Sequence, residues 1–263
     1  MHTLQEAEGL CGPTLILCWK PALAAANPGD RILVGQGTYI PASVFLIDKD
    51  VTILGGHAGI LPSGEIALDP FARDISGTPS ILSGDDALSA FIVIDGVSED
   101  GRLDGFTIEG GRSPDLPSGA SFAPAGAMTI VDSSIDIVRC TFHNNSSGSG
   151  TASGRGGAVS VSGQFDDDDL LTKSAARFIN CTFHDNVASS GGAIAMLERG
   201  DLVNDEPTFV KFVNCLIYDN RTVKNVISAV SAEGSGGAVF IYEGAEVDIV
   251  NCTIKSKKGI GGP

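Results

Sequence analysis

Basic side chains are scarce in this sequence, and their scarcity excludes one large class of function. The 263 residues include 17 lysines and arginines against 32 aspartates and glutamates, so the formal net charge is −15. A protein that binds the phosphate backbone of DNA or RNA needs a basic patch, and we therefore expect no nucleic-acid partner.

Long apolar runs and helical periodicity are also missing. No run approaches the roughly 20 apolar residues of a membrane-spanning helix, so we expect no transmembrane segment. The early run Leu15–Trp19 has no basic segment before it and no small-residue cleavage site after it, and the sequence as given shows no signal peptide. The segments between the apolar stretches are rich in Gly, Ser, Asp and Asn, and they lack the amphipathic stripe that a βαβ fold requires.

Glycine is what the sequence has in excess. It contains 34 glycines and 12 prolines, while 43% of its residues are hydrophobic. The apolar content is too high for a disordered chain, and glycine does not recur at every third position as in collagen. We therefore expect a folded chain with many turns.

Two sequence motifs alternate along the second half of the chain. The first is Gly-Gly-Ala followed by alternating apolar residues, at 156–159, 191–194 and 236–239, with a weaker copy at 125–128. The second is a strand-like segment that carries a cysteine and, in three of its four copies, ends in asparagine, at 137–145, 178–186, 212–220 and 249–254. The cysteines lie 41, 34 and 37 residues apart. Repeated strand motifs joined by loops of variable length are typical of a solenoid.

The period of two within each motif predicts β-strands with one buried face. For the cysteine motif, the expected inward residues are Val138, Cys140, Phe142; Ile179, Cys181, Phe183; Val213, Cys215, Ile217; Val250, Cys252 and Ile254. For the glycine motif they are Met128, Ile130, Val159, Val161, Ile194, Met196, Val239 and Ile241. A register slip of one residue would exchange the two faces, so the assignment is well determined.

Because no helices separate these strands, equivalent strands are expected to stack directly and in parallel, about 4.8 Å apart. The sequence therefore predicts an all-β fold, a parallel β-helix. Equivalent residues then form ladders, one of Cys140, Cys181, Cys215 and Cys252 and one of Asn145, Asn186 and Asn220.

The ends of the chain are expected to differ from the repeats. Residues 1–30 form an N-terminal segment in which Trp19 to Asn27 predicts a short helix that caps the solenoid. Residues 31–263 form a single β-helix domain, with regular repeats from about 120 onward. The last residues follow directly on a repeat, so we expect a truncated C-terminus whose uncapped rung favours self-association.

The repeats resemble those of a known family. Gly-Gly-Ala-[Ile/Val] alternating with Phe142-His143-Asn144-Asn145 and Phe183-His184-Asp185-Asn186 is similar to the repeat of polymorphic outer-membrane proteins. The N-terminal third, in the stretches 22–34, 53–56, 81–85 and 103–111, resembles right-handed parallel β-helix proteins of the pectin-lyase-like superfamily. The resemblance implies a right-handed parallel β-helix and a secreted or surface-exposed bacterial protein.

The cysteines are the first candidate site. The ladder cysteines lack the close spacing of a metal site, and rungs about 4.8 Å apart do not suit a disulfide, whose Cβ atoms lie about 3.8 Å apart. We interpret them as free thiols packed in the core. Cys11 and Cys18 lie in the irregular N-terminus and could pair in an oxidising compartment.

The outward face of the cysteine motif offers a second candidate. His143, His184 and Tyr218 occupy equivalent positions, which suits either a metal or sugar-binding column or an ordinary exposed strand surface. Asp185 and Asp219 follow at the bend, and a glycosidase would need two such carboxylates about 5–9.5 Å apart in a cleft.

We expect no cofactor, although an acidic run makes calcium a candidate ligand. Asp166, Asp167, Asp168 and Asp169 form a run of four acids, which fits either calcium or a solvated loop. The catalytic signatures of polygalacturonases and pectate lyases are not recognisable.

Two functions follow as hypotheses. The first is a non-enzymatic β-helix, secreted or at the cell surface, that serves adhesion, binding or structure with a polysaccharide or a cell-surface component as partner. The alternative is a polysaccharide lyase or glycoside hydrolase, which rests on analogy of fold.

Overall fold

The computed structural model describes residues 19–59, 63–65, 67, 69, 71–88, 91–113, 125–148, 154–163, 174–197, 208–223, 236–242 and 244–255. Within these residues nearly all regular structure is strand, and every strand pairing is parallel. The prediction of an all-β chain of stacked parallel strands is confirmed.

Four parallel sheets make up the structure, and successive strands of the chain belong to different sheets. The first sheet contains β1 (Arg31–Gly35), β4 (Thr52–His57), β7 (Gly101–Asp104), β11 (Ser134–Val138), β15 (Ala175–Ile179), β19 (Phe209–Val213) and β23 (Glu246–Val250). The second contains β2 (Gly37–Tyr39), β5 (Ser80–Ser83), β8 (Phe106–Glu109), β12 (Thr141–His143), β16 (Thr182–His184), β20 (Leu216–Tyr218) and β24 (Thr253–Lys255).

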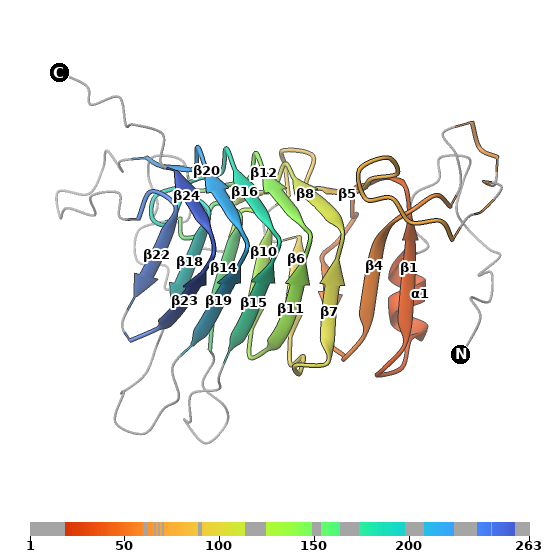
Figure 1. Ribbon diagram of the computed structural model, residues 1–263, viewed down its shortest axis with the longest axis horizontal. Helices are drawn as coiled ribbons and strands as arrows, with labels where there is room; N and C mark the ends of the chain where they lie inside the picture. Colours follow the sequence, from red (N-terminus) through yellow and green to blue (C-terminus); the bar gives the residue numbers. More distant parts are fainter. Residues whose placement is uncertain are drawn as a thin grey trace.

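The third sheet contains β3 (Phe45–Ile47), β6 (Ile92–Asp95), β10 (Met128–Val131), β14 (Val159–Ser162), β18 (Ile194–Leu197) and β22 (Val239–Tyr242). The fourth is short, with β9 (Arg112–Ser113), β13 (Ser146–Ser147), β17 (Val187–Ala188) and β21 (Arg221–Thr222). The chain visits the first, second and third sheets in turn, and from β9 onward it also visits the fourth between the second and third. We call each such passage a coil, and Figure 1 shows the coils following one another along the long axis.

Columns of like side chains fill the space enclosed by the sheets. Phe142 and Phe183 stack with ring centroids 4.8 Å apart, and Phe178 stacks on Phe212 at 5.4 Å. All four are fully buried. In-register parallel pairing places equivalent residues above one another, so each coil repeats the packing of the last.

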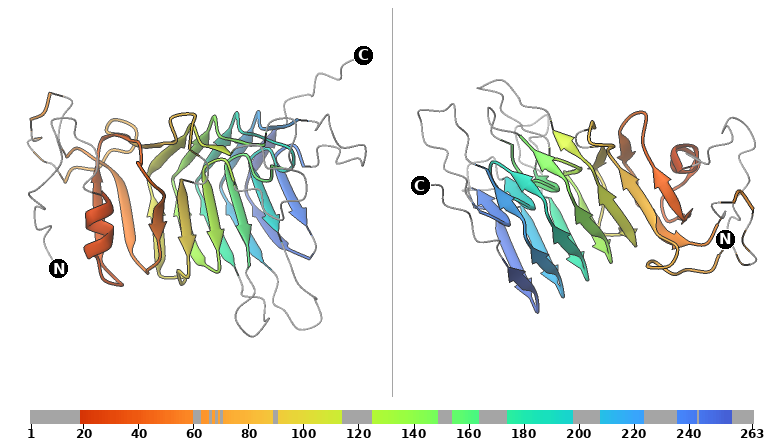
Figure 2. Two further views of the ribbon diagram at one scale, coloured as in Figure 1. Left: turned by 180° about the vertical axis from the view of Figure 1, so that it is seen from behind. Right: turned by 90° about the horizontal axis from the view of Figure 1, so that it is seen from above.

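A short helix lies against the N-terminal end of these columns. Helix α1 (Trp19–Ala25) sits beside β1, the edge strand of the first sheet (Figure 2). Leu23 is buried in the core cluster, with Ala22 and Ala26 packed against it. The helix therefore covers apolar side chains that the first coil would otherwise expose to water.

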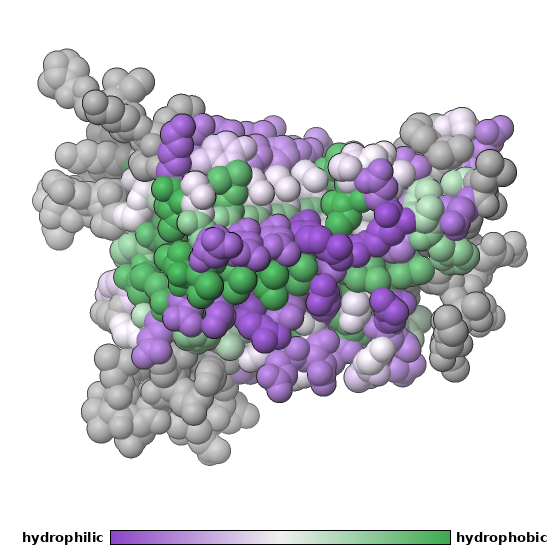
Figure 3. Space-filling model, viewed as in Figure 1, coloured by the Kyte–Doolittle hydropathy of each residue, from purple (hydrophilic) through white to green (hydrophobic). Residues whose placement is uncertain are grey.

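The cysteine motif differs from its prediction, because it forms two strands instead of one. The chain turns between β11 and β12 at Arg139, which has a φ of 50°. This extra residue shifts the alternation, so Ile135 and Ile137 face inward before the turn and Cys140 and Phe142 face inward after it. The placement of Val138, Ile179, Val213 and Val250 on the inward face with Cys140 is therefore wrong. None of the four belongs to the core cluster. They lie on the other face of the first sheet, where Val138 is still buried and Val250 is 45% exposed. Figure 3 shows a hydrophobic band beside a polar one on this side of the molecule.

The expected inward residues of the last coil are also more exposed than predicted. Ile241 and Ile254 pair in register with the buried Met196 and Ile217, yet they are 45% and 46% exposed. No further coil covers them among the described residues.

Candidate functional site: the outer face of the second sheet

Two columns of side chains point outward from the second sheet. They alternate along each strand with buried residues such as Phe142 and Phe183, and in-register pairing aligns them from coil to coil. The threonine column contains Thr107, Thr141, Thr182, Leu216 and Thr253. The ring column contains Glu109, His143, His184, Tyr218 and Lys255.

The three rings of the ring column stack face to face. The centroids of His143 and His184 are 5.0 Å apart with an 8° angle between the planes, and those of His184 and Tyr218 are 5.0 Å apart at 11°. Because the rings cover one another's faces, they offer solvent mainly their edges. The column therefore suits hydrogen bonding to a ligand better than stacking against a sugar ring.

Acidic side chains lie beside the histidines. Nε2 of His143 lies 3.1 Å from Oε2 of Glu109, and Nδ1 of His184 lies 2.9 Å from Oδ2 of Asp185. Burial lowers the pKa of His143, and the neighbouring His184 lowers it further, against the opposing charge of Glu109.

We expect the imidazole of His143 to titrate below its ordinary pKa of about 6.5. The substitution His184→Gln should raise this pKa because it removes a neighbouring positive charge, and Glu109→Gln should lower it further. Histidine side-chain chemical shifts followed by NMR as a function of pH would report both changes. Shifts of equal sign in the two variants would contradict the stacked arrangement.

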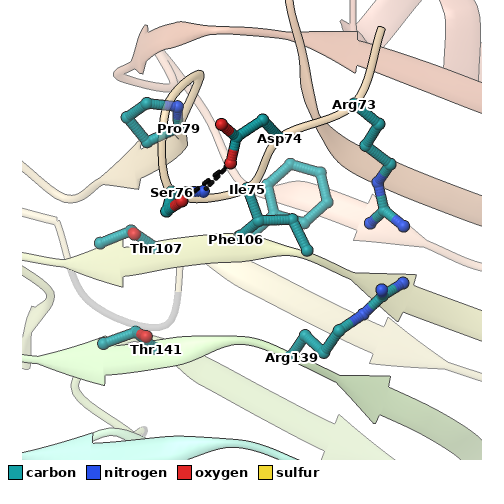
Figure 4. Close-up of a pocket in the computed structure, with 9 residues that line it drawn as sticks. All are labelled: Arg73, Asp74, Ile75, Ser76, Pro79, Phe106, Thr107, Arg139 and Thr141. Carbon is teal, nitrogen blue, oxygen red and sulfur yellow. Dashed lines mark hydrogen bonds between the residues drawn. The ribbon is translucent and has the colours of Figure 1, made fainter.

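An open pocket adjoins the threonine column. Residues 71–79 leave the coil and lie over β8 and β12, and they enclose a space of about 660 Å³ with these strands. Figure 4 shows its lining, which consists of Arg73, Asp74, Ile75, Ser76, Pro79, Phe106, Thr107, Arg139 and Thr141. The pocket is open to solvent, and Thr141 lies two residues from His143 on the same strand.

Three arginines converge on one carboxylate beside this pocket. Asp104, which is 1% exposed, accepts hydrogen bonds from Arg73 at 2.8 Å, Arg102 at 2.9 Å and Arg139 at 2.7 Å. Burial tends to raise the pKa of Asp104, but the hydrogen bonds from Arg139, Arg73 and Arg102 outweigh burial and hold it below its usual range. The hydrogen bond to Asp104 in turn raises the pKa of Arg139.

The backbone at Arg139 is strained. Its φ of 50° lies in the left-handed region, which asparagine tolerates far better than arginine does. The equivalent corners of the next three coils hold Asn180, Asn214 and Asn251, each with a φ of 52–54°, and the preceding coil holds Gly105. Strain of this kind persists where surrounding interactions hold the residue in place, and it clusters at functional sites.

The structure brings some sequence-predicted residues together. His143, His184 and Tyr218 share the ring column. Asp185 and Asp219 occupy equivalent corners of neighbouring coils with φ values of 54° and 52°. The run of Asp166, Asp167, Asp168 and Asp169 lies outside the described residues, as do Cys11 and Cys18.

The four ladder cysteines are free thiols stacked at the start of the second sheet, with Cys140, Cys181 and Cys215 buried and Cys252 half-buried. Burial raises the pKa of Cys140 to about 12, so this thiol stays neutral near pH 7. Cys140 therefore packs as a small apolar group. Cys215 differs, because a hydrogen bond from the Cys181 side chain lowers its pKa to about 7.

The asparagine ladder is a chain of buried hydrogen bonds. Oδ1 of Asn186 accepts from the backbone N–H and the side-chain amide of Asn145, and Oδ1 of Asn220 accepts the same pair from Asn186. The side-chain amide of Asn186 also donates to the carbonyl of Phe142. Each asparagine therefore ties two coils together at the end of the second sheet.

Sequence reasoning missed Arg73, Asp104 and Arg139. Arg139 could have been found as the one arginine at a corner that three later repeats fill with asparagine. Arg73 carries no such signal, since it lies in a non-repetitive excursion and reaches Asp104 only through the three-dimensional fold.

The described part of the chain contains no group of three or more His, Cys, Asp or Glu side chains arranged to hold a metal ion. None of its helices has the length and apolar character needed to span a membrane.

Comparisons with protein-family models, curated proteins and solved structures find no match.

Proposed function

We propose that this protein is a right-handed parallel β-helix, secreted or at the cell surface, that binds an extended glycan along the outer face of its second sheet without catalysing a reaction. The in-register ring and threonine columns are the observation that carries the proposal. The resemblance of the repeats to polymorphic outer-membrane proteins and to the pectin-lyase-like superfamily supports the fold and the location.

Right-handedness is supported by a general property of parallel connections. A chain that leaves one strand and returns to its parallel neighbour in the same sheet does so almost always with a right-handed crossover. In each sheet, the strand of one coil is followed by a parallel neighbouring strand from the next coil. The same preference therefore applies to every coil and favours a right-handed helix.

The spacing of the polar groups favours a polymer. Hydroxyls of Thr107, Thr141 and Thr182 recur once per coil, about every 4.8 Å, and a sugar unit in an extended glycan has a similar length. The edges of His143, His184 and Tyr218 recur at the same interval in the adjoining column. A ligand whose hydroxyls repeat along its length can therefore meet equivalent groups on successive coils.

The pocket chemistry weighs against the hydrolase or lyase alternative. Asp74 is the carboxylate in its lining, and hydrogen bonds from Gly77 and Ser76 lower the pKa of Asp74. A glycosidase needs two carboxylates, one with a raised pKa. The pKa of Arg139 is raised, so its guanidinium is also poorly suited to accept a proton.

We expect isothermal titration calorimetry to detect binding of at least one of three hexasaccharide-sized probes: cellohexaose, hyaluronan and dextran sulfate. The double variant His184→Ala and Tyr218→Ala should bind about tenfold more weakly, because it removes hydrogen-bonding edges from two coils.

Arg177→Ala serves as the control, since Arg177 lies on the outer face of the first sheet and pairs with Asp136. It should bind as the wild type does. No binding of any probe at millimolar concentration, or equal weakening in the control, would overturn the proposal.

A further inference from the structure

We propose that Arg73 and Arg139 form a subsite for an oxyanion, a carboxylate or a sulfate ester, carried by the bound glycan. This inference rests on the proposed glycan-binding function and names its substrate class. It follows from the charge, the free hydrogen-bond donors and the backbone strain around the pocket.

The charges around the pocket do not cancel. Three guanidinium groups surround the single buried carboxylate of Asp104, and all three reach it at hydrogen-bond distance. Asp74 also lines the pocket, but its carboxylate accepts hydrogen bonds from Ser76 and the backbone N–H of Gly77. Figure 4 shows Asp74 turned toward Ser76, away from the guanidinium groups. A local positive charge therefore remains in a chain whose net charge is −15.

Donors on two arginines are left for a ligand. Arg139 uses Nε and Nη2 on Asp104, and Arg73 uses Nε on the carbonyl of Gly55 and Nη2 on Asp104. Among the described residues, no partner is found for Nη1 of either group. The guanidinium groups of Arg73 and Arg139 lie at one end of the pocket (Figure 4), and both are hydrogen-bonded to the carboxylate of Asp104. A planar or tetrahedral oxyanion that enters the pocket beside Asp104 can accept hydrogen bonds from the remaining Nη1 donors.

The surroundings place this subsite within reach of the ring column. Thr107 and Thr141 belong to the pocket and to the threonine column, so their hydroxyls adjoin both. A sugar unit with its oxyanion in the pocket beside Asp104 would continue along the threonine column toward His143. One extended ligand can therefore occupy the pocket and the column together.

The strain at Arg139 argues that its side chain has a role beyond bracing Asp104. Arg73 and Arg102 contact Asp104 independently, and asparagine at the corner would relieve the left-handed backbone as in the next three coils. Arginine occupies this corner although its backbone there is unfavourable. A ligand oxyanion that Arg73 and Arg102 do not bind without Arg139 would explain why.

The substitution Arg139→Asn separates binding from structure. It installs the residue that the equivalent corners already contain, and it leaves Arg73 and Arg102 on Asp104. We expect the variant to stay folded with a modestly lowered urea unfolding midpoint, because Arg73 and Arg102 still pair with Asp104. Its affinity for hyaluronan hexasaccharide or sized dextran sulfate should fall about 10- to 100-fold, as expected for the loss of charge-assisted hydrogen bonds. The affinity for cellohexaose should not change.

The probes distinguish the sources of the oxyanion. Hyaluronan carries carboxylates only, dextran sulfate carries sulfate esters only, and cellohexaose carries neither. Tighter binding of either charged probe than of cellohexaose, lost in Arg139→Asn and retained in the charge-matched control Arg177→Asn, would support the inference and identify the group.

Equal affinity for cellohexaose and the charged probes would overturn the oxyanion subsite and leave the glycan-binding face standing. A wild-type affinity for the charged probes in Arg139→Asn would overturn it as well. Failure of all three probes to bind would overturn both proposals.

Discussion

Replacing Asn186 by alanine is expected to lower the free energy of unfolding by about 2–5 kcal/mol. Asn186 is fully buried, and its side chain joins the coils on both sides of it. Its removal leaves the backbone N–H of Asn145 without the acceptor Oδ1 and the carbonyl of Phe142 without the amide donor. A buried polar group without a partner costs about 1–3 kcal/mol, and the substitution creates two.

Urea unfolding followed by circular dichroism would measure this loss. Thr182→Ala is the matched control, because Thr182 lies on the same coil but points outward and is half-buried. It should change stability by less than about 1 kcal/mol. Equal effects of the two substitutions would mean that the asparagine ladder does not hold the coils together.

Replacing Asp104 by asparagine should cost about 3–5 kcal/mol at pH 7, the range for removing one member of a buried ion pair. The substitution leaves three guanidinium groups converging on a neutral amide with no carboxylate to balance their charge. Asp248→Asn is the control, since Asp248 is 53% exposed and pairs with Lys211 at 3.2 Å. Exposed pairs of this kind contribute about 1 kcal/mol or less.

The pH dependence follows from the lowered pKa of Asp104. A carboxylate whose pKa is lower in the folded than in the unfolded protein stabilises the fold above the unfolded value, about 3.9. That stabilisation is lost as the pH falls toward the folded value. The stability difference between wild type and Asp104→Asn should therefore be constant from neutral pH to about pH 5 and then shrink. A difference that grows on acidification would contradict the arrangement of the three arginines.

The stacked parallel strands could be predicted because polar and apolar residues alternate even within segments as short as three residues. Thr141, Phe142 and His143 alternate polar, apolar and polar, and Thr182, Phe183 and His184 repeat them. The turn at Arg139 was missed for a physical reason. Arg139 has a left-handed backbone and separates two strands, so the inward and outward positions before it are shifted by one residue relative to those after it. Val138 is apolar, so its side chain does not indicate that it lies on the outer face of the first sheet.

The candidate site could be predicted only in part. His143, His184 and Tyr218 follow from the repeat, because equivalent positions of stacked coils must meet. The pocket does not follow from it, since Arg73 lies 31 residues before Asp104 and joins it through an excursion with no counterpart in later coils. Sequence periodicity carries no information about such a segment.

Mapping a bound ligand onto the sheets is the most direct test of the proposed binding face. We predict that hyaluronan hexasaccharide, added to isotopically labelled protein, will cause its largest NMR chemical-shift changes in β8, β12, β16 and β20 and in the side chains of Arg73 and Arg139. The outward residues of β11, β15 and β19 in the first sheet should change little. Changes concentrated on the first or third sheet, with the second sheet unaffected, would contradict the assignment of the ligand to this face.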